Sequence, residues 1–187
     1  MKKRIIGVMG SGKGALPREC DRAFELGQHI ARAGWVLLTG GRNEGGMDAA
    51  NRGAKAAGGL TLGLLPGSSQ NEVSDSVDLV VFTGMGHARN VMNVLSSEVV
   101  IACGIGLGTA SEVALALKIG RPVILVGEDD LSAQFFFRCL ESNGENEGGR
   151  SPETPSSLLP RLYQVRTVSE AIAQVRQLID DDAIDGM

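Results

Sequence analysis

The sequence is poor in aromatic residues, in cysteine and in positive charge. Aromatic side chains make up 4% of the 187 residues, and 18 Lys and Arg are outnumbered by 22 Asp and Glu, for a formal net charge of −4. A nucleic-acid surface needs a basic stripe and stacking rings, so we expect no nucleic-acid partner. Cys20, Cys103 and Cys139 are widely spaced without a C-x-x-C or H-E-x-x-H pattern. They predict neither a disulfide framework nor a metal site made by the protein.

Long apolar runs are also missing. No run approaches the roughly 20 residues that a membrane helix needs. The apolar residues that follow Lys2-Lys3-Arg4 are interrupted by Gly7, which is unlike a signal peptide. We therefore expect a cytoplasmic protein with no membrane partner. With 43% apolar residues, the chain is long enough to bury one sizeable core.

The sequence does contain an alternation of short apolar runs and helical patterns, which is typical of βαβ units. Strands are expected at 4–9, 35–38, 60–65, 79–82, 99–102, 122–126 and 162–165, with helices at 17–34, 47–57, 87–95, 109–119 and 168–179. We predict a single α/β domain over 1–187, with a Rossmann-like, doubly wound, mostly parallel sheet of about seven strands and helices on both faces. Residues 141–157 predict a mobile surface loop, and 180–187 an acidic tail.

The 26 glycines gather in loops that follow the expected strands. These loops are Gly10-Ser11-Gly12-Lys13-Gly14, then Thr39-Gly40-Gly41 with Gly45-Gly46, and finally Gly104, Gly106 and Gly108. The carboxyl ends of parallel strands meet in one crevice, where helix N-termini can hold a phosphate. An ordinary strand-to-helix turn explains the first loop equally well. Gly14 lacks the hydroxyl that an ATPase phosphate loop needs, and no dinucleotide fingerprint fits. Lys13 adds charge to this crevice or is simply solvated.

The expected helix at 87–95 has two distinct faces. Its apolar face consists of Ala88, Val91, Met92 and Leu95. Arg89, Asn93 and Ser97 share another face, with Asn90 close to it. An arginine near a helix N-terminus gains nothing from the helix dipole, so this placement suggests an anionic partner. The alternative is a solvated arginine beside two surface asparagines.

Thr109-Ala110-Ser111-Glu112 opens the next expected helix and matches the capping-box pattern. In that interpretation Thr109 and Glu112 cap each other's backbone. The functional alternative is a carboxylate held beside an anion site, where it acts as a general acid or base or binds a sugar hydroxyl. Whether His87 or Cys103 contacts a ligand stays open.

Two stretches carry a family resemblance. GIGLGTASE resembles the PGGxGTxxE motif of the Lonely Guy (LOG) family, and GMGHARNVMN resembles the Arg-containing helix that precedes that motif. The similarity extends over residues 4–126. LOG enzymes release a free base and ribose 5-phosphate from nucleoside 5′-monophosphates, and the resemblance implies Arg89 and Glu112 as the catalytic residues if the chain is a hydrolase. Together with the glycine loops, it implies a ligand-binding set of Gly10, Ser11, Gly40, Gly41, Gly45, Gly46, Arg89, Asn90, Asn93, Gly106, Leu107, Gly108, Thr109 and Glu112.

The same region looks closer to a sister branch that includes the molybdenum cofactor carrier proteins. Gly104 and Ile105 stand where the LOG enzymes carry Pro and Gly, and Asn90 stands where they commonly carry Lys. This branch implies a binding or carrier protein for an anionic phosphorylated heterocycle, foremost the molybdenum cofactor (molybdopterin), whose metal needs no protein ligand. A nucleoside 5′-monophosphate phosphoribohydrolase is the alternative. A DNA-processing protein, which shares a similar domain, is a third.

The resemblance also implies self-association. LOG-like proteins are usually homodimers or larger, so we expect a homodimer or homotetramer. A stripe of small residues on the expected helix 47–57 suits close helix contact between copies, although packing inside one chain explains it as well. The stripe consists of Ala49, Ala50, Ala54 and Ala57.

Overall fold

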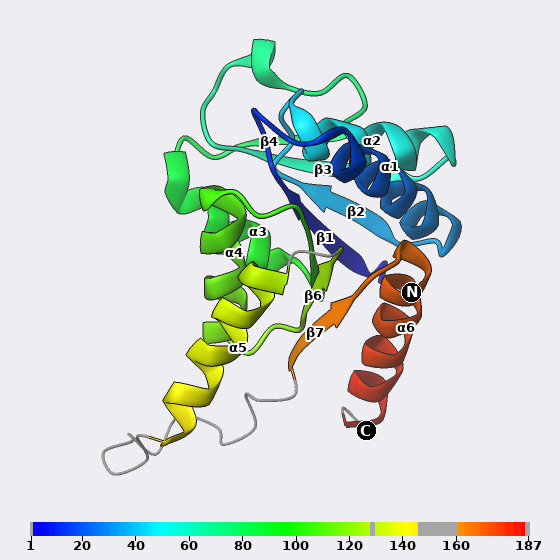
Figure 1. The fold of residues 1–187 in the computed structure, drawn as a ribbon. Helices are drawn as coiled ribbons and strands as arrows, with labels where there is room; N and C mark the ends of the chain where they lie inside the picture. The colour runs from blue at the N-terminus through cyan, green and yellow to red at the C-terminus, as the bar shows by residue number, and fades with distance from the viewer. Residues whose placement is uncertain (1, 128–129, 146–160, 186–187) are drawn as a thin grey trace.

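The computed structural model describes residues 2–127, 130–145 and 161–185 and contains one seven-stranded sheet (Figure 1). All strands are parallel, in the order β4-β3-β2-β1-β5-β6-β7. Their bounds are β1 Ile5–Gly10, β2 Val36–Thr39, β3 Leu60–Leu65, β4 Leu79–Phe82, β5 Val99–Cys103, β6 Val123–Val126 and β7 Leu162–Val165. The predicted Rossmann-like α/β fold is confirmed, with each strand within a residue of its expected ends.

Helices cover both faces of the sheet. They are α1 Pro17–Arg32, α2 Gly45–Ala56, α3 Arg89–Ser96, α4 Leu107–Lys118, α5 Asp130–Glu145 and α6 Val168–Asp185. The helices α1, α2 and α6 share a hydrophobic core with one face, and α3, α4 and α5 share a second core with the other. No helix among the described residues is long and apolar enough to cross a membrane.

The strand order reverses direction between β1 and β5. The chain runs outward from β1 to β4 and then returns to place β5 on the other side of β1. Gly10 pairs with Cys103 at the carboxyl ends of these two strands. Open α/β sheets bind ligands at such a switch point, because the loops leave the neighbouring strands in opposite directions and open a crevice.

Two expectations near the C-terminus are wrong in part. Helix α5 was not predicted, and it continues through residues 141–145, where the loop over 141–157 was expected to begin. Buried Ala133 and Phe136, three residues apart, give this helix its packed face. Residues 146–157 lie outside the described part of the chain. Helix α6 likewise runs through Asp185 rather than ending before an acidic tail at 180.

Glycine brings α1 and α2 into backbone contact. A Cβ atom at Gly27 would fall well inside van der Waals contact with the carbonyl oxygen of Ala50, and one at Gly53 would overlap that of Phe24. Ala49, Ala50 and Ala54 are fully buried in this packing, so the alternative that they serve packing inside one chain holds. The stripe does not support self-association.

Gly27→Ala is therefore expected to destabilise the fold, although alanine is the better helix former by about 1 kcal/mol. Forcing the two helices apart costs about 1–3 kcal/mol, which outweighs that gain. Denaturant unfolding measures the change, with Gly67→Ala as the control because a Cβ atom at Gly67 meets nothing within 4 Å. An increase in stability for Gly27→Ala would contradict the close helix contact.

Candidate functional site

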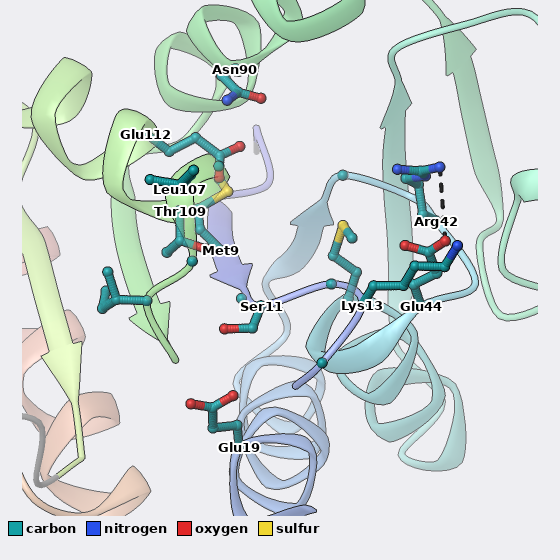
Figure 2. Close-up of a pocket in the computed structure, with 18 of the residues that line it drawn as sticks. Met9, Ser11, Lys13, Glu19, Arg42, Glu44, Asn90, Leu107, Thr109 and Glu112 are labelled. Atoms are coloured by element: carbon teal, nitrogen blue, oxygen red, sulfur yellow. Dashed lines mark ion pairs between the residues drawn. The ribbon is translucent and has the colours of Figure 1, made fainter. Parts of the chain in front are cut away.

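A cavity of about 710 Å³ opens at the carboxyl edge of the sheet, where the loops after β1, β2 and β5 converge (Figure 2). This size suits a heterocyclic ligand that carries a phosphate. Ten of the fourteen residues predicted to bind ligand line the cavity, namely Gly10, Ser11, Gly40, Arg89, Asn90, Gly106, Leu107, Gly108, Thr109 and Glu112. Residues far apart in sequence are thus brought together around one space.

The other four predicted residues support the wall from behind. The Gly46 N–H donates to the carbonyl oxygen of Ser11 at 2.9 Å and fixes the first glycine loop. Gly45 and Gly41 have φ values of 52° and 74°, which favour glycine in these turns. Asn93 is fully buried beneath the cavity. The structure places none of these four in the lining.

Helix α3 turns its polar face inward. Arg89, Asn93 and Ser97 are buried, whereas Val91 and Leu95 of the apolar face are 38% and 54% exposed. Ala88 of this face is exposed as well, so most of the apolar face lies on the surface rather than in the core. The alternative of a solvated arginine is wrong, because Arg89 is buried. Specific hydrogen bonds stabilise the inverted orientation. The Ser97 hydroxyl donates to the Asn93 carbonyl at 2.7 Å, and the Asn93 amide donates to Glu112 Oε1 at 2.6 Å.

Arg89 and Glu112 form the buried charged centre of the site. Arg89 Nη1 lies 3.9 Å from Glu112 Oε1, and both residues are more than nine-tenths buried. Burial raises the pKa of Glu112, while the Asn93 hydrogen bond and the Arg89 charge act in the opposite direction. Burial also lowers the pKa of Arg89. Arg89 Nε finds no hydrogen-bond partner among the described residues, so the guanidinium retains a donor for a ligand.

Helix α4 presents its N-terminus to the same cavity. The helix begins at Leu107, and the residue before it, Gly106, has no side chain to cap it. The capping-box prediction is wrong, because the helix begins two residues before Thr109 and Glu112 bonds to Asn93 instead. The first N–H groups of α4 have no partner within the helix, and with the helix dipole they favour an anion. The residues that surround these groups, Ser11 and Thr109, add hydroxyls.

Several lining residues were absent from the predicted set. They include Val8, Met9, Gly12, Lys13, Gly14, Leu16, Glu19, Arg42, Glu44, Met47, His87 and Ile105. Arg42 is the most informative, because it brings a second guanidinium to the cavity directly after Gly40-Gly41. Its position directly after the glycine pair that ends a predicted strand is the sequence signal that could have identified it.

The two residues left open by the sequence have different places. His87 lines the cavity and is exposed. Cys103 does not line it; its thiol is buried and donates to the Glu19 carbonyl at 3.4 Å. Burial raises the pKa of Cys103 to about 12, so the thiol remains protonated and serves packing.

The fold and the site define a Rossmann-like α/β protein with a cavity at the switch point of its sheet. Comparison with protein families agrees with this class. The profile described as the SLOG cluster4 family matches residues 3–154. The chain belongs to this family and thereby to the LOG-like Rossmann superfamily.

Solved structures and curated proteins supply more specific likenesses. The molybdenum cofactor binding protein of Rippkaea orientalis is 49% identical, with a TM-score of 0.83, over 96% of this chain and 99% of that one. The molybdenum cofactor carrier protein of Chlamydomonas reinhardtii is 45% identical with a TM-score of 0.80 and the same coverage. A cytokinin riboside 5′-monophosphate phosphoribohydrolase of Mycobacterium tuberculosis is 31% identical over 57% of this chain and 61% of its own length. Solved structural neighbours of this chain are thus molybdenum cofactor carrier proteins.

The raised pKa of Glu112 predicts a pH-dependent contribution to stability. The folded protein holds this proton more tightly than the unfolded chain, whose glutamate has the ordinary value of 4.5. Relative to Glu112→Gln, the wild type should therefore lose free energy of unfolding as the pH rises from 4.5 through the higher folded-state pKa. Denaturant unfolding of both proteins across this window measures the difference. A difference that is constant with pH, or that changes in the other direction, would contradict the assigned environment.

Proposed function

We propose that this protein binds the molybdenum cofactor as its cargo and carries it in the cavity at the carboxyl edge of the sheet. The observation that carries the proposal is the 49% identity, over nearly the whole chain, to a molybdenum cofactor binding protein. The cofactor is an anionic phosphorylated heterocycle, and the cavity is large enough to admit one. Its chemistry stays with its own metal and pterin, so the protein needs to bind and shield it.

The residues of the cavity suit such a ligand. The open N-terminus of α4 holds the phosphate, because its N–H groups and dipole favour negative charge. Arg89 contributes the unpartnered Nε and a positive charge whose attraction to an anion is strengthened by burial. Asn90 and Thr109 supply neutral polar groups for the heterocycle. In this account Glu112 orients Arg89, and Asn93 fixes Glu112.

Hydrolysis of nucleoside 5′-monophosphates is the second candidate. Arg89 and Glu112, the pair that the LOG resemblance implies as catalytic, do meet at the cavity. A relative with phosphoribohydrolase activity in its name matches part of the chain. In that function Glu112 acts on the substrate itself rather than on Arg89.

Retention of cofactor tests the first proposal. The protein purified from cells that make the cofactor should contain molybdenum, measured by mass spectrometry, and pterin, measured by fluorescence after oxidation. Arg89→Lys keeps the charge beside Glu112 but loses the forked donors, so its affinity should fall about tenfold or more. Arg52→Lys is the matched control, because Arg52 is exposed on α2 and pairs with Asp48. Glu112→Gln should change affinity only modestly.

A hydrolysis assay tests the second candidate function. A panel of nucleoside 5′-monophosphates is incubated with the protein, and free base and ribose 5-phosphate are measured. Steady release that disappears in Glu112→Gln, from a protein that retains no pterin, would replace the carrier function with a hydrolase.

We also infer that a second copy of the chain covers the exposed face of α3 and α4. Leu95 and Leu107 are 54% and 93% exposed, and Val91 lies on the same side of α3 as Leu95. Helices α3 and α4 pack together, and the Asn90 amide donates to Ser111 across them at 2.7 Å. Ser111 and Ala114 of α4 are exposed and small, which permits close approach of an identical face.

Leu95→Glu should convert the predicted homodimer or homotetramer to smaller species, because it brings like charges into an apolar contact. Light scattering coupled to size exclusion measures the mass. Ala56→Glu places the same charge at an exposed position of α2, on the other face of the sheet, and should leave the mass unchanged. A wild-type protein that is monomeric at micromolar concentration would contradict the assembly.

A further inference from the structure

Backbone contacts with the end of η1, the short 3₁₀ turn at Gln70–Glu72, and with Val73 after it hold Arg42 at the cavity. Arg42 forms an isolated antiparallel bridge with Val73, and the Asn43 N–H donates to the Glu72 carbonyl at 2.9 Å. Arg42 Nη2 lies 3.3 Å from Glu72 Oε1 and 3.8 Å from Glu44 Oε1. Yet Arg42 Nε is buried and has no partner among the described residues. The side chain is fixed in place with a donor left over.

Arg42 lies close enough to Arg89 to affect it. The charge of Arg42 lowers the pKa of Arg89, in addition to the larger effect of burial. Glycine at position 40 makes room for this arrangement, because a Cβ atom there would lie 2.7 Å from Arg89 Nη1. Two guanidinium groups with unpartnered Nε atoms thus line one cavity. Arg89 extends from Glu112, 3.9 Å away, toward Gly40 at the end of β2. Neighbouring positive charges that are partly removed from water repel each other unless an anion lies between them.

The other anion-binding feature lies across the cavity. Figure 2 shows Arg42 on one side, with Leu107, Thr109 and Glu112 of α4 on the opposite side. The open N–H groups of α4 and the Arg42 side chain therefore lie on different sides of the cavity. One cavity contains two places for negative charge, one formed by a helix N-terminus and the other by two arginines.

We propose that Arg42 and Arg89 form a second anion subsite, so that the cavity selects a ligand with an anionic group at each end. This inference rests on the proposed carrier function and deepens it. A phosphorylated heterocycle with an oxoanion at its far end occupies both subsites. A nucleoside 5′-monophosphate has one anionic end, so it places no anionic ligand group at the arginine subsite. Arg42 is thereby a specificity-determining residue that separates cargo binding from nucleotide binding.

Inorganic molybdate and inorganic phosphate are the probes for the two subsites. Each is titrated into the wild-type protein and Arg42→Gln, and backbone amides are followed by TROSY NMR. In the wild type, saturable shifts are expected at two groups of amides, residues 40–42 and residues 107–109. In Arg42→Gln the response at 40–42 should be lost, with the dissociation constant from 107–109 changed by less than about twofold, because these subsites are separate.

Matched variants keep the result interpretable. Arg52→Gln removes the same charge from an ion pair outside the cavity and should respond like the wild type. Arg42→Lys keeps the charge toward Glu72 but loses the forked donors, so its response at 40–42 should be intermediate. Arg42→Lys therefore reports on the subsite even if Arg42→Gln disturbs the bridge to Val73. Identical responses at 40–42 in the wild type and both Arg42 variants would overturn the proposal.

Cofactor retention separates this inference from the proposed function. Arg42→Gln should retain about tenfold less molybdenum and pterin than Arg52→Gln if the arginine subsite holds one end of the cargo. Wild-type protein and Arg42→Gln that retain cofactor equally would contradict the inference and leave the carrier function intact. Wild-type protein that retains no cofactor, but shows both groups of anion shifts, would contradict the carrier function and leave the second subsite intact.

Discussion

Arg89 and Glu112 bring opposite charges into positions that are more than nine-tenths buried. Such a pair costs free energy unless the charges lie close together and their remaining polar atoms find partners. Asn93 meets part of that requirement by donating to Glu112 from below, and it obliges α3 to turn its polar face toward the sheet. The apolar side of α3 is then left on the surface. Burial of this pair therefore determines the floor of the cavity and, on the outside, the face that we assign to self-association.

The space above this pair exists because side chains are missing around it. A Cβ atom at Gly10 would lie 3.1 Å from the Cys103 carbonyl oxygen, so a larger residue there would press the loop after β1 away from the end of β5. The absence of a side chain at Gly40 leaves room for the Arg89 guanidinium, and Gly106 has no side chain that could cap α4. Glycine at these positions thus allows close approach of backbone and side chains around the cavity.

The sequence was sufficient to predict the strands and the glycine loops that converge at the cavity, for physical reasons. Strands 60–65, 79–82 and 162–165 are short apolar runs bounded by turn residues, and parallel topology then brings their following loops together. The orientation of α3 could not be predicted, because periodicity assigns the apolar face to the core and does not include a partner 19 residues away. The capping pattern at Thr109 failed for a similar reason, since Gly106 begins the helix earlier. Arg42 was missed because the bridge to Val73, which is distant in sequence, determines where the Arg42 side chain lies.

The central claim is that the cavity between β1 and β5 binds one ligand whose negative charges face the N-terminus of α4 and the two arginines. A crystal structure of the protein with the molybdenum cofactor bound tests this most directly. The account predicts the phosphate within hydrogen-bond distance of the N–H groups of Leu107–Thr109, and the oxoanion end beside Arg42 and Arg89. Cofactor bound outside the cavity, for instance on the apolar face of α3 and α4, would contradict it.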